Sequence, residues 1–265
     1  MVVIINSSRY TFNMDLFVIF IFIFGACLGS FLCVLADRLP RGEQVLRGRS
    51  HCERCRHVLA PIDLIPVISY LASGGRCKYC HTRLPIHLLL LEILSGFVLA
   101  FLYLYSVYLA MPALFFILLS IIFFCYIGIF VSDQLTGIIP DEFNVVIGVA
   151  TLLMLIFYHP TDLVVHIASG LGAFIFFLSL YLATRGRGMG FGDVKLAFLL
   201  GFFLGFPQII VSLYFAFLTA TFVSLILVIL GKKKLRGGTI YFGPFLVAGG
   251  VFAYFLTDQV IKLFF

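Results

Sequence analysis

The chain has 265 residues, of which 62% are hydrophobic and only 11% are charged. An ordinary soluble domain carries about 25% charged residues, so this composition excludes a water-soluble globule and a disordered chain. The formal net charge is +6, and sixteen of the 18 Lys and Arg residues lie in residues 38–83, 185–195 and 232–236, between apolar runs. Such clustering is the positive-inside pattern of a membrane protein. It predicts contact with the lipid bilayer and argues against nucleic-acid binding.

Eight apolar segments predict an all-α polytopic membrane protein with about eight transmembrane helices. They are residues 16–35, 86–109, 111–131, 143–158, 163–183, 194–206, 209–230 and 240–263. The fourth and sixth are shorter than the roughly 20 residues that a straight span needs. Eight spans place all three basic segments on the cytoplasmic side and both termini outside. Basic residues follow the first segment rather than precede it, so we expect a transmembrane helix and not a signal peptide.

The polar stretch between the first two segments predicts a small zinc-ribbon-like cytoplasmic loop domain. We expect a first transmembrane helix within residues 1–36, this loop domain at 37–85 and a transmembrane core at 86–265. The loop contains two Cys-x-x-Cys pairs, separated by twenty-one residues: Cys52, Cys55, Cys77 and Cys80. Two such pairs can close a tetrahedron around a structural zinc ion. Two disulfides or four free thiols are the alternatives, although a reducing cytosol disfavours disulfides.

Two acids at the ends of apolar segments are candidates for catalysis. Asp133 follows the third segment and Asp193 precedes the sixth, which predicts that both lie near the cytoplasmic face. A carboxylate at membrane depth costs roughly 2.5–3.5 kcal/mol on insertion scales, so each acid needs an explanation. Peptide hydrolysis needs a base to activate water and an acid to polarise the carbonyl, and two carboxylates sharing a proton supply both. Gly190 and Gly192 would let a substrate strand approach Asp193 closely.

Structural roles for these acids remain open at the level of sequence. Asp193 could cap the sixth helix, and Asp133 could be an ordinary interfacial loop residue. Asp141 follows Pro140 and fits the first turn of the fourth helix, where both residue types are favoured.

Two further charged residues are candidates for supporting the acids. Glu92 lies about two turns into the second segment, and a cation such as Arg83 or Lys195 would be a structural explanation for it. Lys195 could extend its long side chain toward the membrane surface, or it could influence the titration of the two acids.

Four motifs, taken in this order, resemble those of the type IV prepilin peptidases, aspartic proteases of the bacterial inner membrane. They are residues 29–40, the two Cys pairs enclosing residues 63–71 and followed by Glu92, Asp133 seven residues before Pro140, and residues 190–195, which resemble the Gly-x-Gly-Asp box of the family. The sequence Asp-Leu-Ile-Pro at 63–66 resembles the corresponding sequence in the Gram-positive competence branch of the family. Glu53 and Asp63 depart from many members, which have Pro and Asn there.

The resemblance implies that Asp133 and Asp193 are the catalytic pair. The implied enzyme removes the short basic leader of a prepilin or pseudopilin after a Gly, on the cytoplasmic face, in a type IV pilus or competence pathway. It also implies N-methylation of the new N-terminal residue with S-adenosylmethionine, and zinc in the cysteine loop. A polytopic transporter, or a non-enzymatic membrane scaffold with a structural zinc loop, is the alternative.

Overall fold

The computed structural model describes residues 7–42, 50–52, 54–186, 188–230 and 241–264, with side-chain surroundings between residues 16 and 257 of these ranges. Within them, the regular elements are helices, together with two isolated β-bridges. The chain forms two compact units, Met1–Phe124 and Cys125–Phe265, which divide within one helix, α4 (Ala113–Thr136).

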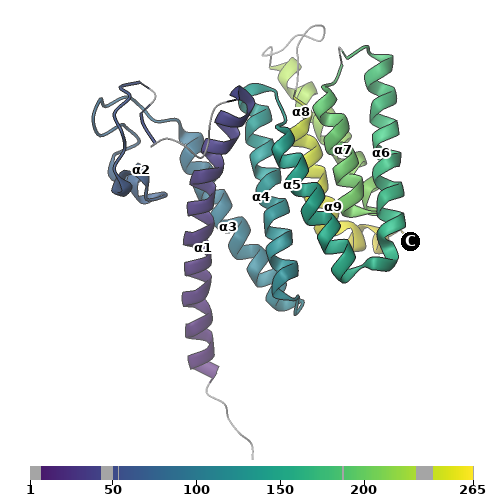
Figure 1. Ribbon diagram of the computed structural model, residues 1–265, viewed down its shortest axis with the longest axis horizontal. Coiled ribbons are helices and arrows are strands. Elements are labelled where there is room, and N and C mark those ends of the chain that lie inside the picture. Colours follow the sequence, from purple (N-terminus) through teal and green to yellow (C-terminus); the bar gives the residue numbers. More distant parts are fainter. Residues whose placement is uncertain (1–6, 43–49, 53, 187, 231–240, 265) are drawn as a thin grey trace, which may run out of the picture. The chain divides into compact units, whose positions relative to one another are not determined.

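The first unit is built on the pairing of α1 (Ser7–Arg38) with α3 (Ile86–Tyr108) (Figure 1). A methyl group on Gly29 of α1 would lie 2.6 Å from Ser95 of α3, so glycine permits this close approach. Three short elements lie between these two helices in the chain: η1 (Leu39–Arg41), η2 (Pro61–Leu64) and α2 (Ile68–Ala72).

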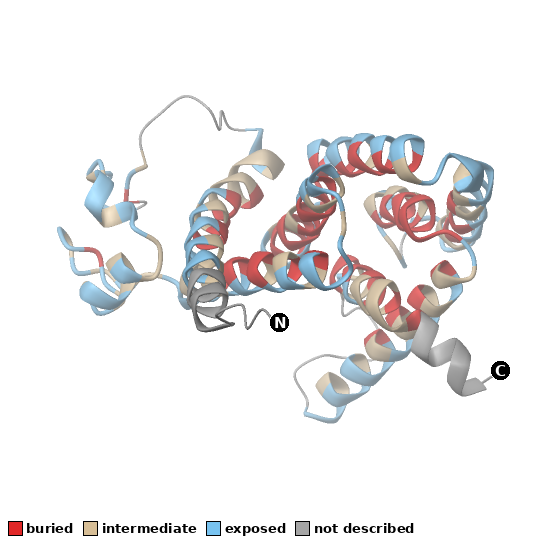
Figure 2. Cartoon of the chain, turned by 90° about the horizontal axis from the view of Figure 1, so that it is seen from below, coloured by how far each residue is buried: buried red, intermediate tan, exposed pale blue. Residues whose placement is uncertain are grey.

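The second unit is a helical bundle around α7. It comprises the end of α4, then α5 (Asp141–Tyr158), η3 (Pro160–Asp162), α6 (Leu163–Ala183), α7 (Phe191–Leu204), α8 (Gln208–Ile229) and α9 (Gly243–Phe264). Helix α7 contacts α5, α6, α8 and α9 and is buried around most of its circumference. In Figure 2 the buried residues (red) gather where helices meet, and exposed residues (blue) turn outward. A helix that is apolar on all sides is stable only inside a bundle, which accounts for the uniformly apolar sixth segment.

Each of the eight predicted apolar segments coincides with a helix. Six helices among the described residues are long and apolar enough to cross a membrane: α1, α3, α4, α5, α6 and α8. The prediction of a polytopic all-helical membrane protein is therefore confirmed. The number of eight spans stays a prediction, because α7 has only 14 residues and α9 is described as an apolar helix only to Thr257. The basic residues at 232–236 lie outside the described residues.

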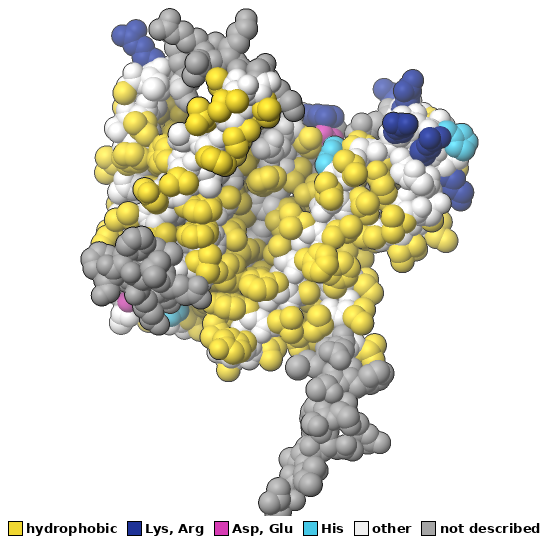
Figure 3. Space-filling view, turned by 180° about the vertical axis from the view of Figure 1, so that it is seen from behind, with side chains coloured by type: hydrophobic (Ala, Val, Ile, Leu, Met, Phe, Trp, Pro, Cys, Tyr) yellow, Lys and Arg dark blue, Asp and Glu magenta, His cyan; other side chains and the backbone are white. Residues whose placement is uncertain are grey.

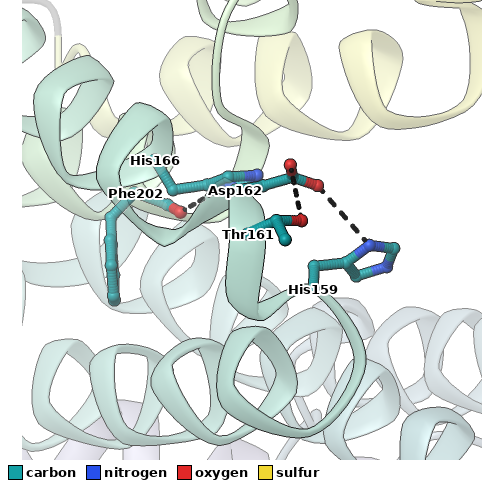
Figure 4. Close-up of polar contacts among 5 residues, drawn as sticks. All are labelled: His159, Thr161, Asp162, His166 and Phe202. Atoms are coloured by element: carbon teal, nitrogen blue, oxygen red, sulfur yellow. Dashed lines mark hydrogen bonds and ion pairs between the residues drawn. The ribbon is translucent and has the colours of Figure 1, made fainter.

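Polar contacts fix the turn between α5 and α6, as Figure 4 shows. His159 Nδ1 lies 3.7 Å from Asp162 Oδ2, and the Thr161 hydroxyl donates to Asp162 Oδ1 at 3.3 Å. In α6, His166 Nδ1 lies 2.8 Å from the carbonyl oxygen of Phe202 and can donate to it. That carbonyl is in the last turn of α7, where helices leave acceptors without intrahelical donors. Its hydrogen bond ties the C-terminal end of α7 to α6.

Candidate active site and cysteine centre

Asp133 follows the third apolar segment, as the sequence indicates, but α4 continues past that segment and Asp133 lies in its last turn. Gly137, with φ +69°, comes directly after the helix, and its N–H donates to the Asp133 carbonyl at 2.9 Å. A glycine in this left-handed conformation is the usual C-terminal cap of a helix. The helix thus continues beyond the apolar run, and the Asp133 side chain is buried, with only 4% of its residue surface exposed. The alternative of an interfacial loop residue was wrong.

Asp193 is the third residue of α7 and is buried as well, with 7% exposed. Its Oδ2 accepts the N–H of Gly190, the N-cap residue, at 3.2 Å. The prediction that Asp193 could cap this helix is therefore correct in part. Asp193 is not the N-cap residue, but its carboxylate accepts a backbone N–H at the helix start from a position in the first turn. This contact engages one carboxylate oxygen and fixes the side-chain orientation.

The surroundings of the two acids meet at shared neighbours: Gly243 adjoins both Asp133 and Ile139, and Ile139 also adjoins Gly192, which directly precedes Asp193. Asp133 Oδ2 is buried and lies beside Gly243, the first residue of α9, and no described residue donates a hydrogen bond to it. A methyl group on Gly243 would lie only 2.7 Å from that oxygen. Both acids therefore adjoin helix N-termini, where unpaired N–H groups and the helix dipole favour negative charge. The two helix N-termini thus offset part of the cost of burying these acids.

Close packing surrounds the acids and involves two residues that sequence reasoning missed. A methyl group on Gly192 would lie 3.2 Å from Ile139 Cβ, and one on Gly243 would lie 3.3 Å from Ile139 Cδ1. Ile139 thus fills the space between the starts of α7 and α9. Gly192 makes room for this side chain, whereas a methyl group on Gly190 would meet only ordinary contacts. The sequence feature that could have identified Gly243 is the Gly-Pro pair near the start of the last apolar segment, because this pattern is typical of helix starts.

Lys195 forms an ion pair with Asp141 across α7 and α5. Asp141 stands in the first turn of α5, as predicted. The Lys195 ammonium also lies 5.6 Å from the ring centre of Phe191. Both charged side chains are partly exposed, so the pair contributes little stability, about 0–1 kcal/mol. Lys195 therefore links two helix starts near the acids.

Glu92 binds a backbone N–H group, and not Arg83 or Lys195, the cations considered as its structural explanation. Its Oε2 accepts the N–H of Val67 at 2.7 Å, and among the ion pairs of the described residues it takes part in none. Val67 has φ +62° and ψ −52°, and the Ile68 N–H donates to the Pro66 carbonyl at 2.6 Å. These features define a γ-turn of the rare positive-φ type. Glu92 thus holds a strained turn of the loop domain against α3.

The two Cys-x-x-Cys pairs form turns of the same construction. In the first, the Cys52 N–H donates to the His57 carbonyl and the Arg56 N–H to the Cys52 carbonyl. In the second, the same bonds join Cys77 to Thr82 and His81 to Cys77. Arg56 and His81 both have φ +55°, and each turn is flanked by one of the two β-bridges, His51–Val58 and Arg76–Arg83. The loop is therefore an internal pair of matching knuckles.

The four sulfurs suit a tetrahedral metal ion. Their Sγ atoms all lie within 4.8 Å of one another, and those of Cys52 and Cys80 are 3.8 Å apart. Zinc–sulfur bonds of about 2.3 Å in a tetrahedron separate sulfurs by about that distance, whereas a disulfide needs about 2.05 Å. The N–H groups of Cys55 and Arg54 lower the pKa of Cys52, and the hydroxyl and N–H of Thr82 lower the pKa of Cys80 to about 6. The pKa of Cys55, in contrast, is raised to about 11 by burial and by the neighbouring thiols of Cys52 and Cys80. Thiolates are the form that binds metals, so the sulfur geometry rather than the pKa pattern supports the metal site.

Comparisons with known proteins agree with this arrangement. Residues 23–106 match the Bacterial Peptidase A24 N-terminal domain, and residues 118–229, which include both acids, match the Type IV leader peptidase family. Similar proteins carry the name prepilin leader peptidase/N-methyltransferase. The one from Bacillus subtilis (strain 168) is 29% identical over 92% of this chain and 96% of the relative. The one from Aeromonas hydrophila is 28% identical over 91% of each.

A third relative of the same name is closer in identity. The protein from Burkholderia pseudomallei (strain 1026b) is 30% identical over 81% of this chain and 69% of its own length. No solved structure matches the chain. The two family matches and these near full-length relatives lead to one conclusion: the chain belongs to the type IV leader peptidase family.

Proposed function

We propose that the protein is an aspartic endopeptidase of the bacterial inner membrane that removes the short basic leader of type IV prepilins or pseudopilins. The cut falls after a Gly on the cytoplasmic face. The observation that carries this proposal is the pair of buried carboxylates, Asp133 and Asp193, at helix ends that both adjoin the surroundings of Ile139 and lie within the matched family region. Gly190 supports the pair by capping and Gly192 by packing, and Lys195 adds a weak, partly exposed link between α7 and α5.

The proposed mechanism is direct attack of water, without an acyl-enzyme. One carboxylate takes a proton from a water molecule while the oxygen of that water bonds to the scissile carbonyl carbon. The other carboxyl group is protonated and donates a hydrogen bond to the carbonyl oxygen. Collapse of the tetrahedral intermediate breaks the C–N bond, and a proton passes to the leaving amine. The substrate backbone must unwind near the Gly, because an intact helix keeps its amides in internal hydrogen bonds.

The membrane topology belongs to the same proposal. Eight spans, with both termini outside, put the end of α4 and the starts of α5, α7 and α9 on the cytoplasmic side. Asp133, Asp193 and Gly243 then share the face on which the basic leader stays. The division into a first helix at residues 1–36, a loop domain at 37–85 and a peptidase core at 86–265 follows from this topology.

N-methylation of the new N-terminus, with S-adenosylmethionine as donor, is the second proposed activity, and the names of the relatives support it. S-adenosylmethionine would supply the methyl group on its sulfonium centre. Two grooves formed by described residues do not suit this cation. One, on α8, is lined by Tyr214, Phe217, Leu218, Thr221, Phe222 and Leu225, and the other contains two arginines. We therefore assign no residue and derive no step for the transfer.

Co-expression with a prepilin tests the proposed activities. We expect the substrate to migrate faster on a gel after loss of its leader, and mass spectrometry to find a methylated N-terminal residue. The Bacillus subtilis relative serves as the positive control. A substrate that this relative processes and our protein leaves intact would contradict the peptidase assignment and favour a transporter or scaffold. Cleavage without the added methyl group would remove only the second activity.

Zinc is proposed as the ion of the cysteine loop, bound by Cys52, Cys55, Cys77 and Cys80 in a zinc-ribbon-like domain. Four thiolates leave no open coordination position, so the ion folds the loop and takes no part in hydrolysis. We expect the purified protein to contain stoichiometric zinc and the Cys77→Ser variant to lose it, as measured by elemental mass spectrometry. Cys27→Ser, which changes an exposed cysteine of α1, is the matched control and should keep its zinc. Equal zinc contents in the two variants would contradict the assignment.

A further inference from the structure

The cysteine domain exposes a row of large apolar side chains that neither α1 nor α3 covers. Ile62, Ile68 and Leu71 are 66%, 64% and 65% exposed, and Leu64 and Ile65 about 40%. These residues belong to η2, α2 and the turn between them, not to a membrane-spanning helix. Five large apolar side chains exposed within ten consecutive residues are typical of an interaction site.

The row is fixed at the depth of the first turns of α3. Glu92 is the seventh residue of α3, and at 1.5 Å per residue it lies about 9 Å from the start of the helix. Its carboxylate accepts the Val67 N–H at 2.7 Å, and the Tyr70 hydroxyl donates to the Leu84 carbonyl at 3.3 Å. Helix α3 has 23 residues, slightly more than the roughly 20 that span the hydrocarbon core. The segment held by Glu92 therefore lies beside the first turns of α3, at the end by which this candidate span enters the bilayer.

Two arginines stand beside this row without a carboxylate partner. Arg76 and Arg83 are opposite each other across an antiparallel bridge, and both are exposed. Among the ion pairs of the described residues, neither guanidinium takes part in any. Together with Tyr70, Leu71, Gly74, Gly75 and Leu84 they line an open groove of about 390 Å³. Like charges in this position repel each other, and an anion between them removes the repulsion.

We propose that residues 61–71, with Arg76 and Arg83, form a lipid-docking face that lies on the adjacent leaflet and binds an anionic phospholipid. The phosphate lies between the two guanidinium groups, and the acyl chains lie along Leu71 and Ile68. Apolar side chains next to unpaired cations are the composition of surfaces that bind at the membrane interface. In Figure 3, Lys and Arg side chains (dark blue) gather at one end of this small domain, and hydrophobic side chains (yellow) line its lower edge.

Lipid fits this face better than the other available partners. The face is joined to α3, itself a candidate membrane span, by the contact of Glu92 with Val67, and Tyr70 joins it to Leu84, just before that helix. A prepilin leader is basic in the proposed function and would be repelled by Arg76 and Arg83. The inference itself does not depend on the peptidase reaction, because it concerns only how the loop domain is held.

A tryptophan probe tests the proposal in the intact protein, which contains no Trp. We place Leu71→Trp in proteoliposomes containing phosphatidylglycerol and measure quenching by brominated lipids. We expect strong quenching by lipids brominated near the headgroup and weaker quenching by lipids brominated deep in the chain. Phe97→Trp, in the middle of α3 and 62% exposed in the wild type, should show the reverse order. Lys78→Trp, at the exposed tip of the second knuckle, should be quenched by aqueous acrylamide alone.

Two outcomes would contradict the proposal of a lipid-docking face. Acrylamide quenching at position 71 equal to that at position 78 would place the row in water. A blue-shifted emission that brominated lipid fails to quench would show that protein, either the peptidase unit or a second copy, covers it. Ile68→Trp repeats the measurement should the Leu71 variant fail to fold.

A charge-removal experiment tests the phosphate site separately. In the Leu71→Trp background, we expect lipid quenching to weaken when phosphatidylcholine replaces phosphatidylglycerol. The Arg76→Gln/Arg83→Gln double variant should lose this dependence on lipid charge. Inorganic phosphate added to the phosphatidylglycerol vesicles should leave the quenching unchanged. If free phosphate abolishes the lipid-charge dependence, or the double variant retains it, the groove is not a headgroup site.

Discussion

The variants Asp133→Asn and Asp193→Asn are each expected to lose prepilin cleavage by about 10²–10⁴-fold, the range typical of a positioned acid or base. An amide has nearly the shape of a carboxylate but cannot hold and return a proton, so each change removes one half of the proposed pair. Both side chains are buried at helix ends, and Asn has nearly the same size and shape as Asp, so the change should preserve their packing and leave the bundle folded. The measurement is the rate of leader removal from a purified prepilin in proteoliposomes.

Asp141→Asn is the matched control for these variants. Asp141 is also an acid at a helix start in the same unit, but it is exposed and pairs with Lys195. Its loss should leave cleavage close to that of the wild type and change the free energy of unfolding by at most about 1 kcal/mol. Full activity in either Asp133→Asn or Asp193→Asn would end the assignment of the catalytic pair.

The sequence was sufficient to predict the helices of this fold because most of them are long apolar segments. It was misleading at the end of α4. There the apolar run stops at Val131, and polar residues usually indicate a loop, yet the cap at Gly137 extends the helix beyond Asp133. Sequence patterns report the composition of a segment, whereas the position of a helix end depends on local hydrogen bonds such as the one from Gly137.

The partners of the charged residues were the least predictable feature. Glu92 is held by the amide of Val67, twenty-five residues away, and Lys195 by Asp141, fifty-four residues away. Such contacts depend on how helices pack and leave no local pattern. The cysteines were easier, because two short motifs of equal spacing fold into matching turns. Once the two turns form, the chain between them has only to bring them together for the four sulfurs to form one cluster.

The close contact between Asp133 and Gly243 leads to the second large expected effect. In Gly243→Ala, the new methyl carbon would lie 2.7 Å from Asp133 Oδ2 and 3.2 Å from its Cγ, too close for non-bonded atoms. Ile139 lies on another side at 3.3 Å, so the methyl group cannot simply turn away. The Asp133 carboxylate or the start of α9 must move. A displacement of about 1 Å in catalytic geometry can lower a rate by about 10²-fold, and we expect a loss of that size.

Gly172→Ala shows whether the loss is specific to this contact. Gly172 is in α6, and a methyl group there would have no neighbour within 4 Å. Alanine is the better helix former by up to about 1 kcal/mol, so this variant should cleave normally and unfold at an equal or higher temperature. Overpacking at Gly243 could lower stability by about 1–3 kcal/mol, which thermal unfolding would reveal. Cleavage by folded Gly243→Ala at the wild-type rate would show that the Asp133 carboxylate need not occupy its position beside α9.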